Sequence, residues 1–178
     1  LCSQFLAYFE QDKSIEFYIH KNKNFKLPDE NQSVIMIGPG TGIAPFRSFL
    51  THRDAIGADG KNWLFFGEQH FVSDFYYQTE IQEWLSTGVL SKLDTAFSRD
   101  QKHKIYVQDR VKEQGKELYN WLNNGAYLYV CGQKDGMSTD VESALIELIA
   151  KESNQDEVSA KNFLEQLEEE GSYQKDVY

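Results

Sequence analysis

The sequence is poor in cysteine, in histidine and in basic residues. Among 178 residues there are two cysteines, Cys2 and Cys131, which are too few for a disulfide framework and lack the spacing of a metal site. The four histidines show no metal-ligand spacing either. These shortages argue against disulfide-stabilised and metal-binding proteins, and they favour a reducing, cytoplasmic setting.

Two further shortages argue against membrane and nucleic-acid classes. No apolar run approaches the roughly 20 residues that a helix needs to cross a bilayer, and the n-region and h-region of a signal peptide are missing. Lysine and arginine number 18 against 28 aspartate and glutamate residues, so the net charge is −10. A nucleic-acid surface would be basic. An acidic surface suits solubility, and it would also suit docking to a basic protein partner.

Apolar and aromatic residues are plentiful enough for a core, at 40% and 14% of the chain, and this excludes a disordered chain. Strand-like and helix-like segments alternate. Strands are predicted at 34–37, 63–66, 90–95, 127–130 and 173–177, and helices at 45–55, 75–87, 109–123, 138–151 and 159–169. Strands separated by helices predict an α/β domain with a parallel five-stranded sheet and helices on both faces.

The first 33 residues are predicted to lie outside this domain. Residues 2–9 have the pattern of a helix capped near Ser3, and residues 15–19 alternate like a half-buried strand. The polar stretch 22–33 predicts a linker. The chain begins at Leu1 rather than at methionine, inside the predicted helix, so we expect a fragment of a longer protein.

A glycine-rich turn stands between the first strand of the domain and its first helix. Three glycines share this turn: Gly38, Gly40 and Gly42. Glycine permits close approach of a ligand to the backbone, and Pro45 suits the first position of the helix. A helix N-terminus behind such a loop binds anions, and pyrophosphate is a frequent one. The spacing matches neither G-x-G-x-x-G nor a Walker A loop, but ligand binding is favoured over a tight structural turn.

One basic cluster follows the third predicted strand. It consists of Ser98, Arg99, Lys104 and Tyr106. Arginine offers a planar fork, lysine a point charge and the hydroxyl groups neutral donors, a combination that fits a phosphate monoester. In a dinucleotide-binding fold, an arginine beside the ribose selects the 2′-phosphate of NADP. The alternative is an ordinary exposed basic turn.

Other residues at the predicted strand ends have structural alternatives. Cys131 ends the fourth strand, and because buried cysteine is usually an inert small apolar residue, catalysis is the minority interpretation from the residues alone. Asp135 and Asp140 lie near the start of the helix predicted at 138–151, where capping is the simpler explanation. Because ligands bind outside the carboxyl ends of parallel strands, we expect these segments and the glycine turn to meet at one rim.

These motifs, in this order, resemble the NADPH-dependent diflavin reductase family. The matching segments are G-P-G-T-G-I-A-P-F-R (38–47), N-W-L-F-F-G (62–67), S-R-D-Q-x-x-K-x-Y-V-Q (98–108), Y-V-C-G (129–132), M-x-x-D-V (137–141) and Y-Q-K-D-V-Y (173–178). The resemblance implies a ferredoxin-NADP reductase-like NADP-binding domain over 34–178. It also implies that 1–33 is the tail of an FAD-binding barrel with its linker, preceded by a flavodoxin-like FMN domain.

The resemblance further implies that NADPH passes hydride to FAD, and that electrons continue through FMN to the haemoprotein subunit of sulfite reductase. The FAD and FMN domains of the same chain would be its other partners. The arginine, tyrosine and serine motif of the FAD barrel is missing, so this segment alone is not expected to hold FAD tightly or to be active. The alternatives are a cytochrome P450 reductase-like enzyme with another acceptor and a nucleotide-binding module without electron transfer.

Individual roles follow from the resemblance by position. The residues implied at the adenosine 2′-phosphate end are Ser98, Arg99, Lys104, Ile105, Tyr106, Val107 and Gln108. Gly40, Thr41 and Gly42 would face the pyrophosphate and the nicotinamide, and Asp140 would contact the nucleotide. Cys131 and Asp176 are the implied catalytic residues, near the centre of hydride transfer.

Three further positions are implied to touch the flavin. Tyr178 matches a terminal aromatic that covers the flavin ring, and Cys2 and Ser3 match the tail of a motif that binds the FAD pyrophosphate. Gln133 departs from the family pattern, in which aspartate commonly follows Cys-Gly.

Overall fold

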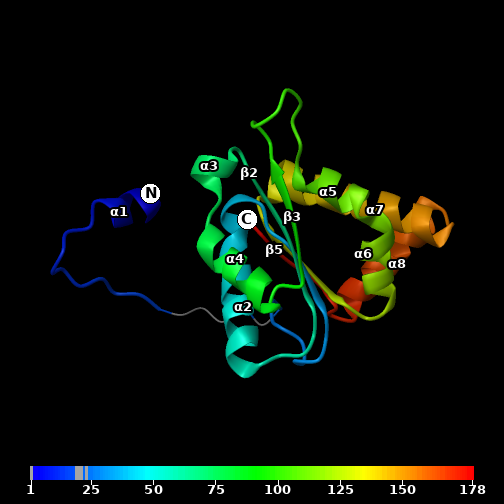
Figure 1. Cartoon of the computed structure of the whole chain (residues 1–178), viewed down its shortest axis with the longest axis horizontal. Helices are drawn as coiled ribbons and strands as arrows, with labels where there is room; N and C mark the ends of the chain where they lie inside the picture. The colour runs from blue at the N-terminus through cyan, green and yellow to red at the C-terminus, as the bar shows by residue number, and fades with distance from the viewer. Residues whose placement is uncertain (1, 19–21, 23) are drawn as a thin grey trace.

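A computed structural model describes residues 2–18, 22 and 24–178, and its main body is one five-stranded sheet (Figure 1). The strands are β1 (Val34–Ile37), β2 (Asn62–Glu68), β3 (Lys92–Phe97), β4 (Tyr127–Gly132) and β5 (Tyr173–Val177). They lie in the order β3-β2-β1-β4-β5, and every neighbouring pair is parallel. The predicted parallel five-stranded sheet is therefore confirmed.

Helices cover both faces of the sheet. One face carries α2 (Ile43–Ile56), α3 (Phe71–Asp74) and α4 (Gln78–Thr87), and the other carries α5 (Val107–Glu113), α6 (Gly115–Asn123), α7 (Thr139–Ser153) and α8 (Glu157–Glu169). Central β1 is fully buried, with Ile35 and Ile37 in one core cluster and Val34 and Met36 in the other. This explains its unbroken apolar sequence, because a central strand of a covered parallel sheet meets apolar side chains on both faces.

The helices differ from their predicted bounds, most of all at 75–87 and 109–123. The helix predicted at 109–123 is divided into α5 and α6 at Gln114, whose side chain donates to Asp94 Oδ1 at 2.9 Å and accepts from Lys92 Nζ at 3.0 Å. The helix predicted at 75–87 is preceded by the short α3 and by Tyr77 in the left-handed region, with φ of 56°. Pro45 is the third residue of α2 rather than its first.

The N-terminal segment stands apart from the sheet (Figure 1). Helix α1 (Cys2–Ala7) forms where a helix was predicted at 2–9, although the side chains of Cys2 and Ser3 are outside the described part of the chain. No strand forms at 15–18, the described part of the strand predicted at 15–19, and Phe17 is 81% exposed. Alternation alone does not make a strand, because the backbone groups need a neighbouring strand to bond.

Packing of the main body starts at Phe25, inside the segment predicted as a linker. Phe25 is buried, and its ring meets the edge of Tyr129 with centroids 5.4 Å apart. The Tyr129 hydroxyl donates to the Lys26 carbonyl at 2.7 Å, and the Lys26 amide donates to Gln174 Oε1 at 2.8 Å. The segment that enters β1 is thus held against β4 and β5.

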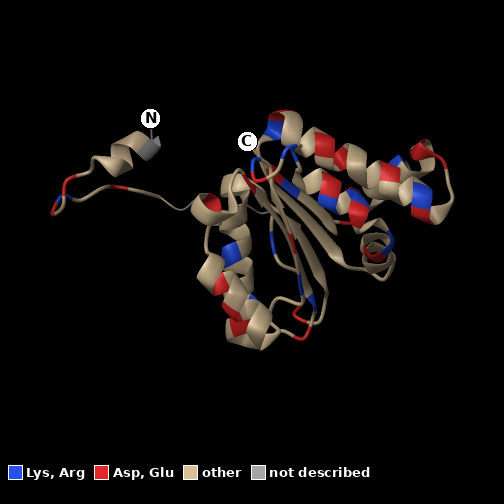
Figure 2. Cartoon of the chain, turned by 45° about the horizontal axis from the view of Figure 1, so that its top comes forward, with Lys and Arg blue, Asp and Glu red and all other residues tan. Residues whose placement is uncertain are grey.

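Charged residues lie mainly on the helices and loops (Figure 2). Several of them form ion pairs between secondary-structure elements. Lys175 of β5, for example, pairs with Glu142 of α7 at 3.3 Å and with Glu168 of α8 at 2.9 Å. Among the described residues, no helix is long and apolar enough to cross a membrane, and no group of three potential metal ligands is found.

Candidate dinucleotide-binding site

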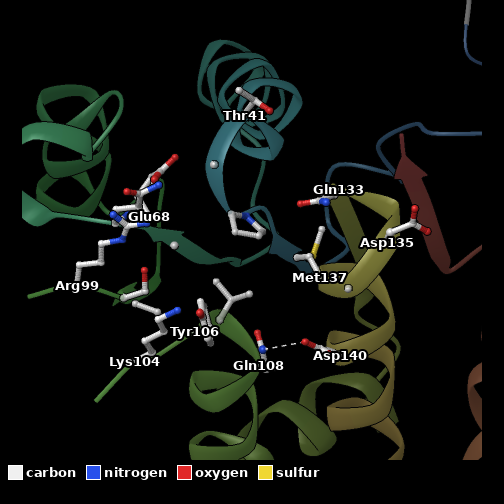
Figure 3. A pocket seen from close by; sticks show the side chains of 18 of the residues that line it. Thr41, Glu68, Arg99, Lys104, Tyr106, Gln108, Gln133, Asp135, Met137 and Asp140 are labelled. Atoms are coloured by element: carbon white, nitrogen blue, oxygen red, sulfur yellow. Dashed lines mark hydrogen bonds between the residues drawn. The ribbon is translucent and has the colours of Figure 1, made fainter. Parts of the chain in front are cut away.

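A cavity of about 760 Å³ opens at the carboxyl ends of the strands. Segments after β1, β2, β3 and β4 line it together with Tyr178, and Figure 3 shows most of the lining side chains. These are the strand ends that the sequence predicted to converge. In a parallel sheet this rim is where ligands bind.

The glycine turn forms the floor of the cavity beside β4. Residues Gly40–Gly42 make one 3₁₀ turn directly before α2, and Gly40 has a positive φ of 58°, a conformation that glycine adopts without strain. A Cβ on Gly42 would lie 2.1 Å from the Cys131 carbonyl oxygen. Gly42 therefore lets the turn rest on the end of β4, while Gly40 and Thr41 face the cavity.

The predicted basic cluster lies together on one wall. Ser98, Arg99, Lys104 and Tyr106 all line the cavity. The Ser98 amide donates to the Glu68 carbonyl at 2.8 Å and the Arg99 amide to the Gln69 carbonyl at 2.9 Å, so the segment is fastened to the end of β2. Among the described residues neither Arg99 nor Lys104 has a carboxylate partner. Both cations are exposed and available to an anionic ligand.

The starts of α5 and α7 supply another part of the lining, next to the basic cluster (Figure 3). Gln108 Nε2 donates to Asp140 Oδ2 at 3.3 Å, which joins the first turns of the two helices. Val107 and Gln108 of α5 and Asp140 of α7 line the cavity. Asp140 thus faces the cavity as well as occupying the first turn of α7.

Several lining residues were not among the site residues assigned from the sequence. They are Pro39, Gly67, Glu68, Gln69, Ala96, Gln133, Asp135, Gly136 and Met137. The rule that ligands bind at strand ends pointed to the segments after β2 and β4, where Glu68, Gln133 and Asp135 lie, but it gave these three residues no role. Met137 could not be found this way, because it reaches the cavity only through a helical turn (Lys134–Ser138) interrupted by Asp135 and Gly136.

Among the predicted site residues whose side chains the structure describes, four do not line the cavity: Gly42, Ile105, Cys131 and Asp176. Cys131 is 2% exposed, and burial together with the charge of Asp176 raises the pKa of its thiol to about 11. Asp176 is exposed and pairs in register with Cys131 across β4 and β5. A thiol with that pKa is protonated at neutral pH, so Cys131 is not a nucleophile there.

The free energy of unfolding is expected to fall as the pH rises from about 9 towards 11. In this window the folded chain keeps the Cys131 proton while the unfolded chain loses it, which costs up to about 1.4 kcal/mol per pH unit. Burial also raises the pKa of Tyr129 and Tyr173, which adds to the fall at the upper end. Urea denaturation at about pH 8, 9 and 10 measures the slope. In Cys131→Ala the slope should be shallower, and an unchanged slope would contradict the assignment.

Tyr178 stands at the mouth of the cavity. Its hydroxyl lies 2.5 Å from Thr41 Oγ1, in a hydrogen bond that joins it to the glycine turn. Its amide donates to the Gly132 carbonyl at 3.1 Å, and its carbonyl accepts from the Lys134 amide at 2.9 Å. The residue remains 66% exposed. It is therefore held by both its backbone and its hydroxyl while most of its surface faces solvent.

These features fit a dinucleotide phosphate. The cavity has the size of a small-molecule site, the open glycine turn precedes a helix N-terminus that favours an anion, and two cations with hydroxyl donors stand on one wall. Three carboxylates also line the cavity, those of Glu68, Asp135 and Asp140.

Comparison with known proteins identifies the class. Residues 36–143, more than half of the chain, match the family model for the oxidoreductase NAD-binding domain, and the chain belongs to this family. It is 54% identical to the sulfite reductase (NADPH) flavoprotein alpha-component of Salmonella typhi over 178 residues, which cover 99% of this chain and 30% of that protein.

Two further relatives carry the same description. The identity is 52% over 178 residues with the protein of Serratia proteamaculans, covering 99% of this chain and 30% of the relative. It is 54% over 170 residues with that of Cronobacter sakazakii, covering 95% and 28%. The chain thus spans about 30% of the length of the curated relatives it matches.

Proposed function

We propose that this chain is the NADP-binding part of an NADPH-dependent sulfite reductase flavoprotein. The observation that carries the proposal is a pair of cations, Arg99 and Lys104, on the wall of a cavity that a glycine turn before a helix also lines. Neither cation has a carboxylate partner in the part of the chain that the structure describes. The names of the relatives support sulfite reductase over other members of the diflavin family. The bound cofactors would supply hydride transfer from nicotinamide to flavin, and the chain would orient the donor.

Each wall of the cavity has a role in this proposal. Arg99 and Lys104, with the hydroxyl groups of Ser98 and Tyr106, would bind the 2′-phosphate, since a fork, a point charge and neutral donors together complement its oxygens. Val107 and Gln108 would shape the adenosine end, with Ile105 packed against the core behind them and Asp140 in contact with the nucleotide. The segment Gly40–Gly42 would receive the pyrophosphate at the start of α2.

The nicotinamide end would lie towards Tyr178. The exposure of Tyr178 and its hydrogen bond to Thr41 support a role as a cover that shares this space with a flavin ring. Cys131 and Asp176, side by side at the ends of β4 and β5, would border the same end. With its raised pKa, Cys131 would act there as a neutral thiol.

The proposal extends to the rest of the protein. Residues 34–178 would form the NADP-binding domain, and 1–33, with Cys2 and Ser3, the tail and linker of an FAD-binding barrel. The packing of Phe25 supports counting 25–33 as part of the folded unit. FAD and FMN domains and a haemoprotein subunit would complete the electron path, in the cytoplasm, a setting that the low cysteine content supports.

Calorimetric titration of the chain with oxidised NADP and with NAD tests this function. We expect NADP to bind at least about a hundredfold more tightly, because each charge-assisted hydrogen bond to the 2′-phosphate contributes roughly 1.5–3 kcal/mol. The purified chain should also be colourless, since the FAD-barrel motif is missing. Equal affinities for the two nucleotides would sink the 2′-phosphate assignment.

A further inference from the structure

Glu68 is a carboxylate held beside the glycine turn. It is the last residue of β2 and lines the cavity. Its Oε1 lies 3.5 Å from the position that a Cβ on Gly40 would occupy, and its Oε2 accepts the Gln69 amide at 2.8 Å. No lysine or arginine within the described residues forms an ion pair with it. Within the described residues, the negative charge therefore stands next to the turn with a backbone amide as its partner and without an ion pair.

A carboxylate at the position of Glu68 is unusual for a site that binds an anion. Arg99 and Lys104 are its two cationic residues, whereas Glu68, Asp135 and Asp140 are acidic. Asp140 is engaged by Gln108, but Glu68 has only a backbone amide. The field of Glu68 reaches its neighbours, because it raises the pKa of the Tyr76 hydroxyl. A pyrophosphate at the glycine turn would meet the same field.

We propose that Glu68 limits the affinity of the site for dinucleotides by repelling the pyrophosphate at the glycine turn. This inference rests on the proposed function. A like-charge contact weakens binding without removing any contact to the ligand. Weak binding has a use in such an enzyme, because release of the spent nucleotide often sets the turnover rate.

Because Glu68 adjoins the turn rather than the basic cluster, its effect should be the same for NADP and for NAD. Glu68→Gln keeps the shape of the side chain and removes its charge. We expect it to tighten both nucleotides by about three- to tenfold at low salt, the size of a partly screened charge contact. The gain should shrink as the ionic strength rises.

The measurement is calorimetric titration of the chain with NADP, with NAD and with inorganic pyrophosphate. Two variants serve as controls. Glu68→Asp retains the charge and should bind all three ligands more weakly than Glu68→Gln does. Glu83→Gln removes a carboxylate from the exposed face of α4, outside the cavity, and should leave all three affinities unchanged.

The outcomes separate this inference from the function on which it rests. Unchanged affinities in Glu68→Gln, or weaker binding, would overturn the repulsion. Tightening of NADP alone would also overturn it, because the carboxylate would then act on the 2′-phosphate. Equal affinity of the unmodified chain for NADP and NAD would contradict the proposed function, and a common gain for both in Glu68→Gln would still support repulsion of the pyrophosphate.

Discussion

Replacing Arg99 and Lys104 together by alanine is expected to lower the affinity for NADP by about two to four powers of ten and to leave that for NAD nearly unchanged. Each residue can make one charge-assisted hydrogen bond to the 2′-phosphate, worth roughly 1.5–3 kcal/mol. About 1.4 kcal/mol corresponds to a tenfold change in the dissociation constant. Both side chains line the cavity and have no carboxylate partner among the described residues, so no internal ion pair is lost.

Calorimetric titration of both nucleotides measures the change in preference. Lys102→Ala is the matched control, because Lys102 is exposed in the same segment but does not line the cavity. It should alter the NADP affinity only slightly, through screened long-range charge. A double variant that loses NADP and NAD affinity by the same factor would show that the cluster does not read the 2′-phosphate.

Gly42→Ala is expected to destabilise the fold by about 3 kcal/mol or more, the upper range for overpacking. The new Cβ would lie 2.1 Å from the Cys131 carbonyl oxygen and 2.8 Å from its carbonyl carbon. Both are backbone atoms in the β4 strand, so no side-chain rotation can relieve the contact. The glycine turn would have to move away from β4, and nucleotide binding would be lost with it.

Urea denaturation, analysed with a common slope, measures this cost. Gly115→Ala is the control, since its Cβ would lie 3.4 Å from Leu148 Cβ and its helical position favours alanine over glycine by about 1 kcal/mol. That variant should be close to the unmodified chain in stability. If Gly42→Ala were equally stable, the contact between the turn and β4 could not be as close as described.

The order of strands and helices could be predicted because buried positions are occupied by apolar residues with the spacing of a strand or of a helix. Strand β1 is apolar at every position because both faces are covered, and the helices show apolar residues at helical spacing. The strand-end rule then brought Thr41, Arg99 and Asp140 to one cavity although they lie far apart in the chain. Family resemblance added roles that the residues alone do not reveal.

Features that depend on contacts between distant residues could not be predicted in this way. The break at Gln114 arises where its side chain bonds Asp94 and Lys92 on β3, and no local signal marks it. Phe25 looks like a linker residue until Tyr129 is seen beside it. Glu68 ends β2, where the strand-end rule places the site, but the 3.5 Å between its Oε1 and the position of a Cβ on Gly40 depends on how distant segments pack.

The place of β1 in the middle of the sheet affects how the chain folds. Val34 is paired with Asn62 on one side and with Tyr127 on the other, so one flank of this apolar strand can close early and the other only after most of the chain has been made. Pairings between such distant segments slow folding, because long loops must close before the contacts form. During synthesis the unpaired flank of β1 is an exposed apolar strand edge that can pair with other chains. The nascent chain therefore needs protection from aggregation until β4 has left the ribosome.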